Sequence, residues 1–189
     1  MRGRANHNSL GVKKGEGEPN FEIKKIDRFD DRVDELWNKV KNNHCFQLER
    51  KKDYLNWRYC DLRAGKYIIC QAESGDEVLG FIVLRDNMGT LDHPEGAIVD
   101  LISLPNRVDV ADALIVSSLT LFEEYPLNVI KAWTTRGHPY EKMLKRRDFI
   151  NTNRIYGFFE HFNFVERASD VTECTPEKFH FQMGDSDWI

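Results

Sequence analysis

The sequence predicts an α/β protein, more narrowly an α+β mixed sheet, in which helices cover the faces of one β-sheet. Three observations support this fold class: helix-like and strand-like apolar patterns alternate along the chain, a glycine-containing turn joins two strand-like segments, and 189 residues fit one core. We therefore expect a single domain over residues 20–189. Residues 1–19 are polar and glycine-rich with only Leu10 and Val12 to bury, so we expect a flexible tail there.

The first part of the domain is predicted to hold one strand and two helices. Residues 21–26 are strand-like, and residues 33–40 place apolar side chains at i, i+3, i+4 and i+7, as in an amphipathic helix. Asp30 or Asp31 can cap this helix. A second helix, rich in aromatic residues, is predicted over residues 51–64, with the following glycine as its stop.

The middle of the chain is predicted to form sheet. Residues 66–72 and 78–85 are apolar and β-branched and flank a glycine-containing turn, which predicts an antiparallel hairpin. Residues 97–104 are almost continuously apolar, as in a strand buried on both faces. We place this strand centrally in the sheet.

The last part continues the alternation of helix and strand. A helix is predicted over residues 110–125 with Asp109 as its cap, then a strand over residues 129–133 and a shorter helix from Pro139. Two further strands are predicted near the end of the chain, over residues 155–164 and, half-exposed, over residues 178–183.

The charge of the chain argues against a nucleic-acid partner. The formal net charge is −4, with 31% charged residues, whereas a nucleic-acid groove needs a basic surface. Two short basic clusters, at residues 50–52 and 145–147, are interpreted as solvated faces of helices.

The cysteine spacing does not indicate a metal site. Cys45, Cys60, Cys70 and Cys174 form no Cys-x-x-Cys pair and no zinc-ligand spacing with histidine, so we expect reduced thiols and no metal. His138 is assigned to a helix-capping loop. No apolar leader and no apolar run of about 18 residues is present, so we expect no membrane partner and a cytoplasmic location.

Two local segments and the order of elements point to a family. Residues 54–59 are Tyr-Leu-Asn-Trp-Arg-Tyr, and residues 184–187 are Gly-Asp-Ser-Asp. The expected order is a strand, two helices, a three-strand antiparallel meander, and then helix, strand and helix. In these features the chain resembles the GNAT N-acyltransferases over roughly residues 21–189. The resemblance implies a GNAT-like fold with a central mixed sheet flanked by helices.

The resemblance also implies a cofactor site. In that family acetyl-CoA or another acyl-CoA lies between the fourth and fifth strands, and a Q/R-x-x-G-x-G/A loop holds its pyrophosphate at a helix N-terminus. Arg107 matches the Q/R position, but residues 105–112 contain no glycine, and Asp109 and Asp112 would repel a pyrophosphate there. The implied cofactor-binding residues are Leu101, Ser103, Arg107, Val108, Asp109 and Val110.

A second family motif concerns the general acid. Family members carry an L-Y-x-x-x-G-F stretch on the last helix, whose Tyr protonates the departing coenzyme A thiolate. Alignment on Phe149 puts Leu144 at the Tyr position and Asp148 at the Gly position. Tyr140, one helical turn earlier, and Tyr156, beyond the helix, are the candidate replacement acids.

Asp100 is the candidate base for an attacking amine. It lies inside an apolar strand, where an unpaired carboxylate would be costly, so we expect a functional or a bridging role for it. Glu95 could approach the same site from the preceding loop. Trp57 and Arg58 lie where the family lines its acceptor cleft, and Arg58 could hold a substrate carboxylate.

The leading hypothesis is therefore an acyl-CoA-dependent N-acyltransferase that acts on a small-molecule or peptide amine. It requires two adjacent strands to part beneath Arg107 and leave backbone amides free for a thioester. The alternative is a non-catalytic GNAT-like module that binds a small ligand, a peptide end or a protein. A transferase of the FemAB kind would need two such domains, and exposed sheet edges could support a homodimer.

Overall fold

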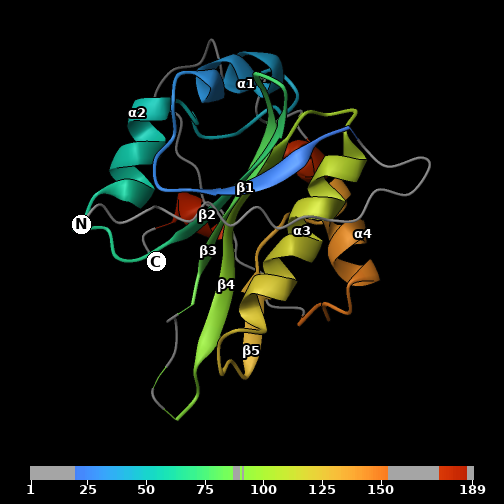
Figure 1. Cartoon of the computed structure of the whole chain (residues 1–189). Coiled ribbons are helices and arrows are strands. Elements are labelled where there is room, and N and C mark those ends of the chain that lie inside the picture. Colours follow the sequence, from blue (N-terminus) through green and yellow to red (C-terminus); the bar gives the residue numbers. More distant parts are fainter. Residues whose placement is uncertain (1–19, 87–89, 91, 153–174, 187–189) are drawn as a thin grey trace, which may run out of the picture.

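The structure is a computed structural model that describes residues 20–86, 90, 92–152 and 175–186. Its sheet has five strands in the order β1-β2-β3-β4-β5 (Figure 1). The predicted tail over residues 1–19, the predicted strand over residues 155–164, and Tyr156 lie outside the described residues.

The sheet confirms the predicted antiparallel meander and its central strand. The first four strands form an antiparallel meander, and β4 pairs with β5 in parallel. The strand predicted to be central, β4, is therefore paired on both sides, while β1 and β5 are the edges. The strands are β1 (Glu22–Ile26), β2 (Ile68–Ser74), β3 (Glu77–Arg85), β4 (Glu95–Ser103) and β5 (Val129–Ala132).

Helices cover both faces of the sheet, as predicted. One face carries α1 and α2, and the other carries α3 and α4 (Figure 1). A π-helix, η1, continues α2, and two short 3-10 helices lie near the C-terminal end. The helices are α1 (Arg32–Val40), α2 (Lys52–Leu55), η1 (Asn56–Cys60), α3 (Val108–Phe122), α4 (Pro139–Arg146), η2 (Pro176–Lys178) and η3 (Met183–Asp185).

The helix boundaries depart from the prediction in two places. The helix predicted over residues 51–64 ends at Cys60, and the glycine meant to stop it, Gly65, has φ of 104° in the loop that leads to β2. Asp109 does not cap α3, because the helix begins at Val108 and Arg107 is the N-cap residue. Asp109 instead lies in the first turn.

The strand predicted over residues 178–183 is wrong. This segment holds the end of one 3-10 helix and the start of another, with a single parallel bridge from Phe179 to Phe46. His180 and Gln182 are buried rather than half-exposed. The alternation of apolar and polar residues resembled a strand, but the polar side chains are the ones that point into the molecule.

Two further expectations need correction. Arg50 is 1% exposed and is not part of a solvated face, although residues 145–147 are exposed as expected. Cys45 is disulfide-bonded, so the expectation of reduced thiols holds for Cys60 and Cys70 but not for Cys45.

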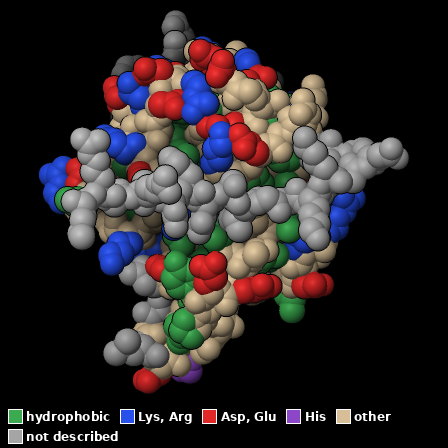
Figure 2. All heavy atoms as spheres, viewed as in Figure 1, with side chains coloured by type: hydrophobic (Ala, Val, Ile, Leu, Met, Phe, Trp, Pro, Cys, Tyr) green, Lys and Arg blue, Asp and Glu red, His purple; other side chains and the backbone are tan. Residues whose placement is uncertain are grey.

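On the face shown in Figure 2, acidic and basic side chains are interspersed rather than gathered by sign. Among the described residues, no helix combines the length and the apolar character that a membrane span needs.

Candidate functional site

Strands β4 and β5 part, as the acyl-CoA hypothesis requires. Their pairing runs from Glu95 with Val129 to Ile98 with Ala132. Beyond that point β4 continues to Ser103, whereas the chain after β5 leaves the sheet and enters α4. The last part of β4 is therefore without a β5 neighbour.

The gap between the parted strands is filled by side chains. Gln182 Nε2 donates a hydrogen bond of 2.7 Å to the Leu101 carbonyl, and the Ser103 amide donates one of 3.1 Å to the Tyr140 hydroxyl. The backbone groups that we expected to be free for a thioester are thus already paired. Any ligand that uses them must displace Gln182 and Tyr140.

Tyr140 is the candidate acid that the fold brings to the gap. It lies in the first turn of α4, is 8% exposed, and its hydroxyl is also 3.3 Å from Ser103 Oγ. Burial raises the pKa of Tyr140 to about 12, so the hydroxyl keeps its proton at neutral pH. The other candidate acid, Tyr156, is outside the described residues.

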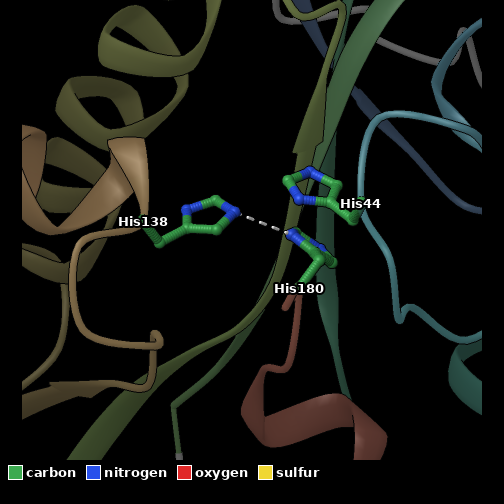
Figure 3. Close-up of side chains that lie close together, drawn as sticks. All are labelled: His44, His138 and His180. Carbon is green, nitrogen blue, oxygen red and sulfur yellow. Dashed lines mark hydrogen bonds between the residues drawn. The ribbon is translucent and has the colours of Figure 1, made fainter. Parts of the chain in front are cut away.

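Three histidines that sequence reasoning did not bring together extend this cluster (Figure 3). His44, His138 and His180 each offer a ring nitrogen, and these atoms lie within 4.8 Å of one another. His138 is the N-cap residue of α4, as the capping prediction required, and its Nδ1 accepts a hydrogen bond from the Tyr140 amide. No short motif links the three positions in the sequence.

Asp100, the candidate base, is fully buried in an ion-pair network. Arg50 Nε donates to both of its carboxylate oxygens at 3.1 Å, and the Tyr59 hydroxyl donates to Oδ2 at 3.0 Å. Arg50 also donates to both oxygens of Asp185, at 2.8 and 2.9 Å. Burial raises the pKa of Asp100, and the Arg50 guanidinium opposes that shift. Asp100 therefore links Arg50 and Tyr59, and bridging was one of the two roles expected for it.

The two segments that carried the family resemblance pack against each other. Arg58 donates to the Gly184 carbonyl at 3.2 Å and also to the Ser186 carbonyl. A Cβ atom added to Gly184 would lie 2.1 Å from the Tyr59 hydroxyl, so this close approach requires glycine. Arg58 thus anchors the C-terminal segment through Nε and Nη2, and a substrate carboxylate would have to compete with these contacts.

The remaining predicted substrate residues lie apart from the gap. Trp57 is 60% exposed beside Tyr54, where it could still meet a ligand. Glu95 begins β4 and pairs with Lys131. Because a strand rises about 3.3 Å per residue, Glu95 lies roughly 16 Å along β4 from Asp100, so the two carboxylates do not share a site.

The turn from β4 to α3 holds the other predicted cofactor residues. Arg107 forms an ion pair with Asp109, 2.8 Å between Nη2 and Oδ2, and its guanidinium lies over the Phe21 ring. Val108 is half-exposed, whereas Val110 is buried in the core. Both Arg107 and Asp109 remain partly accessible, so this turn can still meet a ligand.

The backbone conformation after α4 agrees with the alignment of the family's L-Y-x-x-x-G-F stretch on Phe149. Asp148 has φ of 64°, in the left-handed region that favours glycine. It occupies the position where the family motif carries glycine. Leu144, at the position of the family's Tyr, is buried in the core.

A hollow of about 440 Å³ lies elsewhere, near the start of β2. Tyr59, Lys66, Tyr67, Asp86 and Tyr125 are among its lining residues. None of the predicted site residues lines it, so it adds nothing to the site at the parted strands.

No family model matches the chain, and no curated protein matches it. Solved structures do share its fold. The aminoglycoside N-acetyltransferase AAC(6')-Iy, solved with the bisubstrate analogue CoA-S-monomethyl-acetylneamine, has a TM-score of 0.55 and 13% identity, covering 76% of this chain and 100% of its own.

Two other solved structures agree. A ribosomal-protein-alanine N-acetyltransferase from Brucella melitensis biovar Abortus 2308 has a TM-score of 0.50 and 15% identity, covering 75% of this chain and 99% of its own. An aminoglycoside acetyltransferase from an uncultured soil metagenomic sample, solved with sisomicin, has a TM-score of 0.54 and 13% identity, covering 76% and 97%. The chain therefore has the fold of the GNAT-type acetyltransferases.

Proposed function

We propose that this protein is an acyl-CoA-dependent N-acyltransferase whose thioester binds where β4 and β5 part. One observation carries the proposal: β4 runs past the end of β5, and the hydroxyl of Tyr140 reaches into the opening between them. Solved proteins of the same fold bind coenzyme A derivatives. Acetyl-CoA is the simplest candidate cofactor.

The proposed reaction uses Tyr140 as general acid. The nitrogen of a substrate amine attacks the thioester carbonyl, a C–N bond forms, and the C–S bond breaks. The coenzyme A thiolate then takes the hydroxyl proton of Tyr140, which regains a proton from solvent. A phenol whose pKa is raised to about 12 holds that proton until a strong base forms beside it.

The proposal assigns Asp100 a positioning role rather than that of the base. Its oxygens are occupied by Arg50 and Tyr59, and it is 0% exposed. A buried carboxylate in such pairs cannot exchange protons with a substrate without breaking the network. The attacking amine would instead lose its proton to water.

Binding of a thioester at this site requires side chains to rearrange. For the thioester to contact β4, Gln182 must leave the Leu101 carbonyl and Tyr140 must leave the Ser103 amide. Arg107 would reach the cofactor phosphates only after leaving Asp109. The acceptor is a small-molecule or peptide amine.

A second candidate function is a non-catalytic module with the same fold. The side chains that fill the gap and the glycine-free turn after β4 favour it. In that case the same region of the fold would bind a small ligand, a peptide end or a protein without catalysis.

Calorimetric titration of acetyl-CoA, with a parallel thermal melt, separates the two candidates. A ligand at 100 times its dissociation constant stabilises the folded state by about 2.7 kcal/mol. Binding of acetyl-CoA, followed by thiol release with a panel of peptide and aminoglycoside amines, supports the transferase. No binding at millimolar acetyl-CoA or longer acyl-CoA overturns it and leaves the module.

A further inference from the structure

The three histidines come from three separate parts of the chain. His44 lies between α1 and α2, His138 precedes α4, and His180 follows the bridge at Phe179 (Figure 3). The rings pack closely: the centroid of His44 is 5.1 Å from that of His138 and 5.1 Å from that of His180.

Hydrogen bonds from the backbone hold these segments in place. The Cys45 amide donates to the Lys178 carbonyl and the His180 amide to the Phe46 carbonyl, each at 2.9 Å. The Thr135 hydroxyl donates to the Phe179 carbonyl at 2.6 Å, which ties the loop of His138 to the same segment. Hydrogen bonds between the segments therefore hold the three imidazoles close together.

The spacing of two ring nitrogens matches a tetrahedral metal site. His138 Nε2 and His180 Nδ1 are 3.3 Å apart. Zinc binds imidazole nitrogen at about 2.0–2.1 Å, so neighbouring ligands in a tetrahedron lie about 3.3 to 3.4 Å apart. The ligand nitrogens of all three rings lie within 4.8 Å of one another, so the His44 ring is near enough to complete the set by moving closer.

A polar atom of the cluster is unsatisfied. His44 Nδ1 is buried and has no hydrogen-bond partner among the described residues. A buried nitrogen without a partner carries a desolvation cost that a ligand can offset. Burial also lowers the pKa of His44 and His180, and lowers that of His138 to about 4, which favours the neutral form of each ring.

We propose that His44, His138 and His180 form a site for a divalent transition-metal ion, with zinc as the reference ion. Imidazole nitrogen suits Zn²⁺, Cu²⁺, Ni²⁺ and Fe²⁺ and is a poor ligand set for Mg²⁺ or Ca²⁺. Three histidines fill three of the four positions that zinc prefers and leave one for water or another ligand. The metal site adjoins Tyr140 and Gln182, but the proposal does not rest on acyl transfer.

Two features of the surroundings shape the site. The positive charge of Arg50 acts on His44 and His180, but its guanidinium is paired with the carboxylates of Asp100 and Asp185. Coordination through the facing nitrogens also places a proton on the outer nitrogen of each ring. Two contacts of these outer nitrogens then have to change. One joins the Tyr140 amide to His138 Nδ1 at 3.2 Å, and the other joins Gln182 Nε2 to His180 Nε2 at 3.3 Å.

The test is metal binding by the full chain after removal of metals with a chelator. Calorimetry with Zn²⁺ and visible absorption with Co²⁺ should report one ion per chain, with the absorption bands of a four-coordinate cobalt site. His44→Ala should weaken binding at least tenfold, because it removes one of three ligands. That ring accepts no hydrogen bond at Nδ1, so this variant is expected to fold.

His93→Ala is the matched control, since His93 is exposed and outside the cluster, and it should bind Zn²⁺ like the wild type. Circular dichroism in the presence of chelator checks that each variant is folded. His180→Gln is a second variant that keeps a polar group at a buried position. Absence of stoichiometric binding, or equal affinity of wild type and both cluster variants, overturns the proposal and leaves a packed cluster of neutral histidines. Because no acyl-CoA is present, this outcome is independent of the proposed acyl transfer.

Discussion

The amide of Ser103 on β4 donates a hydrogen bond of 3.1 Å to the hydroxyl of Tyr140 on α4, across the opening between β4 and β5. Tyr140 therefore both closes the opening and carries the proton that the proposed reaction needs. The predictions below separate these two roles and test the surrounding network.

Tyr140→Phe should lower kcat for acyl transfer by about 10²-fold or more, because general acids contribute that much and phenylalanine has no proton to give. Affinity for acetyl-CoA should be retained or increased, since the substitution also removes one contact that closes the site. Steady-state kinetics with calorimetry measure both. Tyr67→Phe, in a tyrosine that lies outside the gap, is the control, and an unchanged kcat in Tyr140→Phe would rule out the assigned acid.

Arg107→Ala should weaken acetyl-CoA binding by about 10- to 100-fold, because a charge-assisted contact to phosphate is worth about 1.5–3 kcal/mol. Asp109→Asn should act in the opposite direction, since it frees Arg107 from its ion pair and removes a repelling charge. Titrations of acetyl-CoA and of dephospho forms of coenzyme A measure the effect. Equal affinities in wild type and both variants would remove Arg107 from the site.

Arg50→Met should destabilise the fold by about 3–5 kcal/mol, because it leaves the buried carboxylates of Asp100 and Asp185 without a counter-charge. Urea denaturation measures the free energy of unfolding. Arg63→Met is the control, because the Arg63 side chain is 84% exposed and its pair with Asp61 should contribute well under 1 kcal/mol. A loss below about 1 kcal/mol for Arg50→Met would contradict the network.

Asp148→Gly should stabilise the protein by about 0.5–1 kcal/mol, since glycine adopts the left-handed conformation at φ of 64° without steric cost. Glu35→Gly, at an exposed position inside α1, should lower stability by a similar amount. Thermal and urea melts of the two variants give the comparison. Opposite signs are expected, and destabilisation by Asp148→Gly would show that the Asp side chain makes a contact of its own.

The sequence predicted the fold well because the signals of β1 to β5 and of α1, α3 and α4 are local. Apolar spacing and turn residues determine these elements without reference to distant partners. Asp100 was also recognisable as unusual, since a carboxylate inside an apolar strand needs a partner. The sequence did not predict Arg50 as that partner, because Arg50 is followed by two solvent-accessible lysines and the three residues together resemble an exposed basic cluster.

The part of the site that the sequence did not reveal depends on distant pairings. His138 and His180 are 42 residues apart, and His44 comes from another segment, so no spacing rule joins them. Gln182 was placed on a half-exposed strand because Phe179 and Phe181 alternate with polar residues. Only the fold shows that the polar residues of this segment face the parted strands.

The most direct test of the account is the affinity of acetyl-CoA for the wild type and for Gln182→Ala, measured by calorimetry under the same conditions. Removing the side chain that donates to the Leu101 carbonyl should open the site and increase the affinity for acetyl-CoA severalfold. Gln47→Ala is the control, because Gln47 bonds to Val40 outside the gap and its loss should leave the affinity unchanged. If neither the wild type nor Gln182→Ala binds acetyl-CoA at millimolar concentration, the opening between β4 and β5 is not an acyl-CoA site.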